Sequence, residues 1–184
     1  MIPYPLELSA KKPILACINF CRESEVALLT AARLAESSGA PLVVLHVIHE
    51  PSNRPGYYRR QGRSDALLPI DAIAERALKG FLSDVRAQHP EQRPLLDRAE
   101  IRLVAGIPET RIPEVARSIG AQLILMGSNG RGSLARLFGG SISDRVAHHG
   151  SIPVTVVNAR PEAWGLLVSS PTNGHRATRS LASR

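Results

Sequence analysis

Aromatic side chains make up only 4% of this 184-residue chain, and cysteine occurs only twice. Two cysteines cannot build a disulfide scaffold, and the spacing of Cys17 and Cys21 is not the paired C-x-x-C of a zinc site. No apolar run approaches the roughly 18–20 residues that cross a bilayer. The first residues also lack a basic segment followed by an apolar stretch, the pattern of a secretory signal. We therefore expect a soluble cytoplasmic protein with no membrane partner.

The excess of positive charge, +7 overall, is concentrated in two short segments. Residues 50–64 and residues 159–184 each hold four arginines and one acidic residue, which leaves the rest of the chain close to neutral. A protein that binds duplex nucleic acid gathers its charge on a folded face or a recognition helix. Here the charge lies in an expected loop and an expected tail, so we predict no specific nucleic-acid partner.

Short apolar runs alternate with segments of helical character, which is the order typical of a parallel α/β sheet. Gly39 follows the first helical segment, where a left-handed residue is favoured, and we expect the third helix to begin at Pro113. The expected strands lie at residues 13–18, 41–47, 100–105, 122–126 and 153–157, and the expected helices within residues 23–38, 70–89, 107–119 and 143–149. We predict one domain over residues 1–158 and a basic, disordered tail over residues 159–184, in which only residues 164–168 could make a local contact.

A glycine-rich segment connects the fourth expected strand to the last helix. Gly127 and Gly130 are followed, nine residues later, by Gly140 and Ser141. Glycines at the carboxyl edge of a parallel sheet let backbone N–H groups approach a phosphate, and the start of the following helix favours an anion. The hydroxyl of Ser141 adds a donor, and Arg131 adds a cation that can reach the outer phosphates. The segment therefore predicts a nucleotide site.

Other nucleotide or catalytic patterns fit less well. A Walker loop is absent, because no lysine follows a suitable glycine. Residues 130–135 match the dinucleotide pattern G-x-G-x-x-[G/A], but no acidic residue follows at about 20 residues to hold a ribose. Ser143, Asp144, His148 and His149 crowd one short helix, unlike the separately positioned groups of a hydrolytic triad.

With the spacing G-2x-G-9x-G-[S/T] intact, the chain resembles the nucleotide-binding branch of the universal stress protein family. The likeness covers about residues 12–158 and includes Leu45-His46-Val47 and Pro153–Val157. It implies an open five-stranded parallel sheet of order 3-2-1-4-5 with helices on both faces, a Rossmann-like fold similar to the adenine-nucleotide alpha-hydrolases. It also implies ATP, with Mg²⁺ brought largely by the phosphates, and a homodimer paired through the last strand, Pro153–Val157.

The resemblance also points to residues outside the glycine segment. Val47 matches the position whose backbone borders the adenine, and Asn19 stands where the family usually has Asp. Because an amide carries no negative charge, we expect weaker ribose contacts, and we expect Phe20, where Gly is common, to narrow the entrance to the site. The candidate nucleotide-binding residues are Asn19, Val47, Gly127, Ser128, Gly130, Arg131, Gly140 and Ser141.

The predicted function is that of an ATP-binding stress-response protein that acts as a homodimeric sensor or adaptor, with no catalytic residue and no protein-held metal assigned. One alternative is a slow ATPase or autophosphorylating enzyme, for which Ser128, Ser141 and Ser143 are the candidate acceptors. A second alternative is a dimer module that has lost ATP binding and acts through an unknown protein partner.

Overall fold

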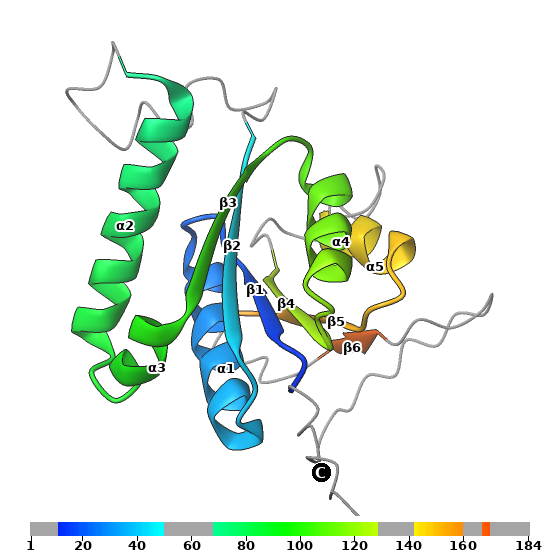
Figure 1. The fold of residues 1–184 in the computed structure, drawn as a ribbon, viewed down its shortest axis with the longest axis horizontal. Coiled ribbons are helices and arrows are strands. Elements are labelled where there is room, and N and C mark those ends of the chain that lie inside the picture. The colour runs from blue at the N-terminus through cyan, green and yellow to red at the C-terminus, as the bar shows by residue number, and fades with distance from the viewer. Residues whose placement is uncertain (1–10, 50–67, 129–141, 160–166, 170–184) are drawn as a thin grey trace, which may run out of the picture.

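The computed structural model describes residues 11–49, 68–128, 142–159 and 167–169, which form one sheet with helices on both faces (Figure 1). The strands are β1 (Ile14–Cys17), β2 (Leu42–Ile48), β3 (Glu100–Ala105), β4 (Leu123–Gly127), β5 (Val154–Val157) and β6 (Leu167–Ser169). The helices are α1 (Arg22–Ser38), α2 (Ile70–Gln88), α3 (Arg93–Arg98), α4 (Pro108–Ser118) and α5 (Ile142–His149).

The strand order is β3-β2-β1-β4-β5-β6. The first five strands in this order are parallel, which confirms the predicted sheet of order 3-2-1-4-5. β6 is an addition: it pairs antiparallel with β5 and lies in the segment that the sequence assigns to the tail. Three residues are too few to carry a strand periodicity, so the pattern could not predict it. Residues 160–166 and 170–184 of the predicted tail lie outside the described residues.

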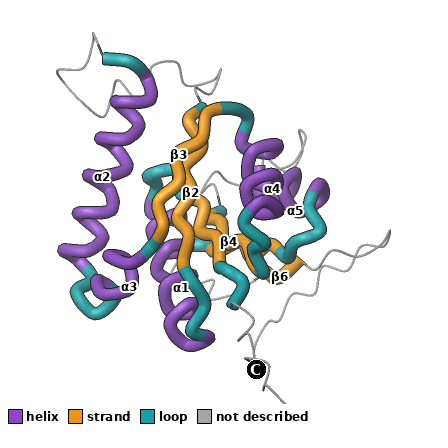
Figure 2. The backbone as a smooth tube through the Cα atoms, viewed as in Figure 1, coloured by secondary structure: helices purple, strands orange, loops and turns teal. Residues whose placement is uncertain are grey.

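Alternate side chains of the parallel strands enter two cores, one on each face of the sheet. One face is covered by α1, α2 and α3, and the other by α4 and α5 (Figure 2). α1 faces the sheet with small, fully buried side chains, among them Ala27, Ala31 and Ala35. It ends as predicted at Gly39, whose left-handed φ of 63° lets its N–H donate to the carbonyl of Glu36.

α4 begins five residues earlier than expected. It starts at Pro108, and Pro113 lies inside it, so the predicted start at Pro113 is wrong. Pro108 occupies the first turn, where a missing N–H costs no helical hydrogen bond. Pro113 cannot donate to the carbonyl of Glu109 one turn earlier, but its ring belongs, with Ile112, to the buried face of α4. Burial of that face therefore offsets the lost hydrogen bond.

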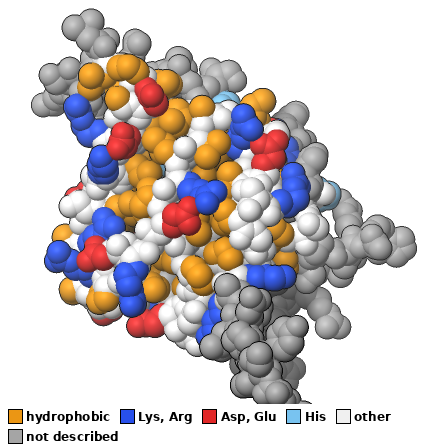
Figure 3. All heavy atoms as spheres, in the orientation of Figure 1, with side chains coloured by type: hydrophobic (Ala, Val, Ile, Leu, Met, Phe, Trp, Pro, Cys, Tyr) orange, Lys and Arg blue, Asp and Glu red, His pale blue; other side chains and the backbone are white. Residues whose placement is uncertain are grey.

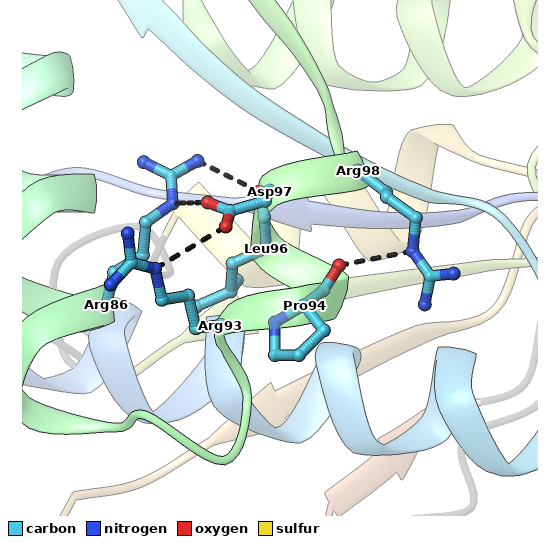
Figure 4. Close-up of polar contacts among 6 residues, drawn as sticks. All are labelled: Arg86, Arg93, Pro94, Leu96, Asp97 and Arg98. Atoms are coloured by element: carbon cyan, nitrogen blue, oxygen red, sulfur yellow. Dashed lines mark hydrogen bonds and ion pairs between the residues drawn. The ribbon is translucent and has the colours of Figure 1, made fainter.

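α3 is a short helix that the sequence did not predict, and it is held against the end of α2 (Figure 4). The guanidinium of Arg86 donates to the Leu96 carbonyl at 2.9 Å, and its Nε lies 2.8 Å from Asp97 Oδ1. Arg93 Nε lies 3.5 Å from the second oxygen of the same carboxylate. Leu96 itself is 1% exposed, so this turn of helix closes the core beneath α2.

On the face shown in Figure 3, basic side chains are interspersed with acidic and hydrophobic ones rather than gathered in one patch. Hydrophobic side chains reach this surface beside α2 and along β3, where Ile101 is 42% exposed. Among the helices that the structure describes, none is long and apolar enough to span a bilayer.

Candidate functional site

A cleft opens at the carboxyl ends of β1, β2 and β4. At this edge the chain order reverses, because β2 and β3 lie on one side of β1 and β4 and β5 on the other, and ligands of open α/β sheets bind at such a point. The strand ends contribute Cys17, Asn19, His46, Val47, Met126 and Gly127 to its lining. The opposite wall comes from two helices, through Pro108, Ile112, Ile142 and Ser143. The cleft therefore brings together Asn19, Val47 and Gly127, three of the eight predicted residues.

Gly127 lies on the floor of this cleft, where β4 passes the first turn of α1. A Cβ added there would lie 2.5 Å from the carbonyl carbon of Glu23 and 2.6 Å from the backbone nitrogen of Ser24. Both are backbone atoms of the first turn of α1 and cannot move aside as the end of a flexible side chain could. Gly127 is therefore required by the packing of β4 against α1, in addition to the role predicted for it toward a phosphate.

Ser128 follows Gly127, and its backbone N–H is already used by the sheet. It donates to the carbonyl of Val157, at the end of β5, over 2.7 Å. Ser128 can therefore offer a ligand its hydroxyl but not this N–H. The four remaining predicted residues, Gly130, Arg131, Gly140 and Ser141, lie outside the described residues.

Asn19 leaves the end of β1 and is tied to the first residues before α1. Its Oδ1 accepts from the thiol of Cys21 at 2.8 Å and from the backbone N–H of Cys21 at 3.4 Å. Asn19 Oδ1 is therefore engaged within the chain. A carboxylate at this position would present only hydrogen-bond acceptors to a ligand, whereas the amide of Asn19 also carries N–H donors.

Phe20 adopts the left-handed conformation with φ of 62°, which is unfavourable for a residue that has a Cβ. Its ring packs against His46, with centroids 4.3 Å apart, and edge-on against Phe81 of α2 at 5.9 Å. Phe20 is not among the residues that line the cleft. Its ring lies between His46, which lines the cleft, and α2, so the expectation that it narrows the entrance stays a prediction.

His46 lies within the predicted second strand, but its hydrogen bond and its ring contact were not predicted. It is 2% exposed, and its Nδ1–H donates to the carbonyl of Ile18 at 2.8 Å. Burial lowers the pKa of His46, and the hydrogen bond to Ile18 opposes that shift only in part. His46 is thus a neutral ring that joins β2 to the end of β1 and supports Phe20. The sequence signal for these contacts was a single histidine within an otherwise apolar strand.

Ser143 and the start of α5 form the far wall of the cleft. Ser143 is buried, and α5 is tied to α4 by an ion pair of 3.0 Å between Arg145 and Glu109. Burial raises the pKa of both thiols, Cys17 and Cys21, so neither is set up as a nucleophile. No group of three or more metal-ligating side chains occurs among the described residues. The cleft lining is largely apolar and includes the polar side chains of Asn19, His46 and Ser143.

A doubly wound parallel sheet with a cleft at its reversal point defines a class of α/β protein that binds ligands at the carboxyl ends of its strands. Residues 11–158 match the sequence model of the universal stress protein family. The chain belongs to that family.

Three comparisons illustrate the relationship. A putative universal stress protein of Staphylococcus epidermidis is 27% identical over 165 residues, covering 87% of this chain and 93% of that protein. Universal stress protein MJ0577 of Methanocaldococcus jannaschii is 26% identical over 160 residues, covering 81% of this chain and 96% of that protein. The solved structure of MJ0577 superposes on this structure with a TM-score of 0.58, over 83% of this chain and 99% of that one. A universal stress protein solved in complex with cAMP has a TM-score of 0.53 at 19% identity, over 83% of this chain and all of that one.

Proposed function

We propose that this protein binds an adenine nucleotide, ATP, in the cleft at the ends of β1, β2 and β4 and acts in the stress response as a sensor or adaptor. The observation that carries the proposal is the cleft itself, whose floor, Gly127, is also the first residue of the G-2x-G-9x-G-S spacing. In this proposal the phosphates lie between Gly127 and the start of α5, where the glycine segment can contact them. The relative solved with cAMP supports an adenine nucleotide as the ligand class.

In this proposal each predicted residue has a defined task. The backbone of Val47 borders the base, the amide of Asn19 donates to the sugar, and the hydroxyl of Ser128 reaches a phosphate. Mg²⁺ enters with the phosphates, since the described cleft lining holds no carboxylate. The further donors toward the phosphates are Gly130, Arg131, Gly140 and Ser141.

The test is a calorimetric titration of the purified protein with ATP and Mg²⁺, with AMP and GTP alongside, after any co-purified ligand has been removed and identified by mass. Gly140→Asp places a carboxylate where the phosphates are proposed to lie, so it should abolish binding. Gly80→Asp is the matched control, because Gly80 lies on the exposed side of α2 and a Cβ there meets no heavy atom within 4 Å. Equal affinity in the two variants would refute the site.

The same experiment separates the alternatives. Phosphate release that is steady in the native protein and lost in Gly140→Asp would identify a slow ATPase, in which Ser143 at the wall of the cleft is a candidate acceptor. The absence of both heat and co-purified nucleotide would identify a module that acts through protein partners. Self-association through Pro153–Val157 stays a prediction.

A further inference from the structure

The strand β3 forms one edge of the sheet, and part of its outer side is open. Among the described residues its only partner strand is β2. The N–H of Gly106 points inward to β2, whereas the carbonyl of Ala105 points outward and accepts from Arg111 at 3.1 Å. Because successive residues of a strand point their backbone groups to opposite sides, the N–H and C=O groups of Ile101 and Leu103 also face outward, and no described residue pairs with them. A free strand edge of this kind can accept a further strand.

An apolar groove runs beside this open edge, between β3 and α2. Leu78 and Leu82 of α2 line it together with Ile101 and Leu103, which lie on one face of β3. The groove has a volume of about 530 Å³, within the range of sites that hold a ligand. The hydrophobic surface beside α2 is visible in Figure 3. An occupant of this groove therefore has to present backbone groups to β3 and apolar side chains to α2.

One segment of the chain has the pattern that this edge requires. Residues 1–10 lie outside the described residues, and residues 2–8 read Ile-Pro-Tyr-Pro-Leu-Glu-Leu. Every second side chain is apolar, which is typical of a strand with one buried face. Proline is tolerated in an edge strand where its missing N–H would face solvent. Pro3 and Pro5 alternate with the apolar residues, so a partner strand that pairs with Leu6 and Leu8 requires no N–H from either proline.

We propose that residues 4–8 dock on the outer edge of β3 as an antiparallel strand of the same chain. Leu8 lies opposite Ile101 and Leu6 opposite Leu103, and each pair exchanges backbone hydrogen bonds through the outward N–H and C=O groups of β3. Residues directly opposite each other point their side chains to the same face of a sheet, so both leucines enter the groove beside α2. One parity of the segment thus satisfies the apolar groove, the open backbone groups and the position of the prolines.

The charges on the other face of β3 select this register. It places Glu7 opposite Arg102, and opposite charges on facing residues stabilise the pairing of two strands. Arg102 uses its Nε toward Glu100 at 2.6 Å, which leaves its two terminal nitrogens for a second carboxylate. A shift of the segment by two residues would set Glu7 opposite Glu100 instead, where two carboxylates repel each other.

The connection to β1 is long enough for this register. Val44 pairs with both Ile101 and Ala16, so Ile101 is level with a point two residues beyond Ile14. A strand outside β3 lies three strand spacings from β1, which puts Leu8 about 16 Å from Ile14. The six residues between these positions span up to about 20 Å when extended. The segment can therefore reach β3 within its own chain.

The first test measures amide hydrogen exchange of β3 in the full chain, residue by residue, by NMR. Leu8→Pro removes an N–H that faces β3, so the N–H groups of Ile101 and Leu103 should exchange at least about tenfold faster than in the native protein. Ser9→Pro is the matched control, because it adds a proline at the parity of the native prolines and should leave both rates unchanged. The N–H of Arg102 faces β2 and should exchange equally slowly in all three proteins. Equal rates at Ile101 and Leu103 in the native protein and Leu8→Pro would overturn the proposal.

The second test fixes the register and identifies the chain that supplies the segment. Glu7→Cys with Arg102→Cys, in a Cys21→Ser background, puts thiols on residues that face each other in the proposed pairing. The Cα separation of such a non-hydrogen-bonded pair, about 4.5 Å, falls in the range that a disulfide spans. The matched control, Glu7→Cys with Glu100→Cys, is displaced by two residues along β3, to about 7–8 Å.

After mild oxidation, peptide mapping should find the disulfide between positions 7 and 102 within one chain, in higher yield than the disulfide of the control pair. Equal yields in the two pairs would overturn the proposed register. A disulfide that forms only between chains would identify a second copy as the occupant of the groove and would overturn docking within one chain.

Discussion

The left-handed backbone at Phe20 leads us to predict that glycine at this position stabilises the fold more than alanine does, the reverse of their usual order. At an ordinary φ, replacing glycine by alanine stabilises a protein by about 0.4–1 kcal/mol, because the unfolded chain loses freedom. At the φ of 62° found for Phe20, a residue with a Cβ is strained by roughly 1–2 kcal/mol. We therefore expect Phe20→Gly to be more stable than Phe20→Ala.

The magnitudes follow from the contacts of the ring. Removal of a fully buried phenylalanine side chain costs about 3–5 kcal/mol. Phe20 is only partly buried, against His46 and Phe81, so Phe20→Ala should cost about 2 kcal/mol. Phe20→Gly loses the same contacts but relieves the strain, so its net cost should be about 1 kcal/mol.

The assay is equilibrium unfolding in urea, monitored by circular dichroism, for the native protein and both variants. Gly80→Ala is the matched control, since Gly80 lies in the interior of α2 with open space around it. This control should raise the free energy of unfolding by about 1 kcal/mol, the ordinary preference of a helix for alanine. If Phe20→Gly is no more stable than Phe20→Ala while the control behaves as expected, the strain argument is wrong.

Two further predictions concern the floor and the side of the cleft. Gly127→Ala should lower the free energy of unfolding by about 1–3 kcal/mol even without nucleotide, because its Cβ meets backbone 2.5 Å away; an unchanged urea midpoint would refute this packing role. Because burial lowers the pKa of His46, the unfolded chain binds its proton more readily, and stability should fall as pH drops through the ordinary value of 6.5. His46→Asn, which keeps a donor near Ile18, should flatten that part of the pH profile; an identical profile would refute the assignment.

The order of strands and helices could be predicted from the sequence because it depends on local patterns. Apolar runs such as residues 41–47 are long enough to mark strands, and the helix over residues 70–88 carries a continuous apolar stripe. Gly39 is a local signal as well, since a left-handed helix end favours glycine whatever lies around it. Elements without such patterns were missed: α3 has six residues and β6 has three.

The candidate site was predictable in its location but not in its contacts. The positions of Asn19, Val47 and Gly127 in one cleft follow from where parallel strands end, which the sequence indicates. The direction of the Phe20 ring depends on Phe81, which lies on another element, α2. The engagement of the Ser128 N–H likewise depends on Val157, at the end of β5.

The sequence by itself determined the class of fold, the edge of the sheet at which the candidate cleft lies, and the family to which the chain belongs. These features are encoded in short-range periodicity and in the spacing of a few glycines. Only the tertiary structure decided which groups remain available at that edge and which edge strand is covered. Both depend on contacts between segments far apart in the chain: Gly127 against Glu23, Phe20 against His46, and β6 against β5. A local pattern carries no information about such pairs, because each segment fits its own local pattern whatever it contacts in the fold.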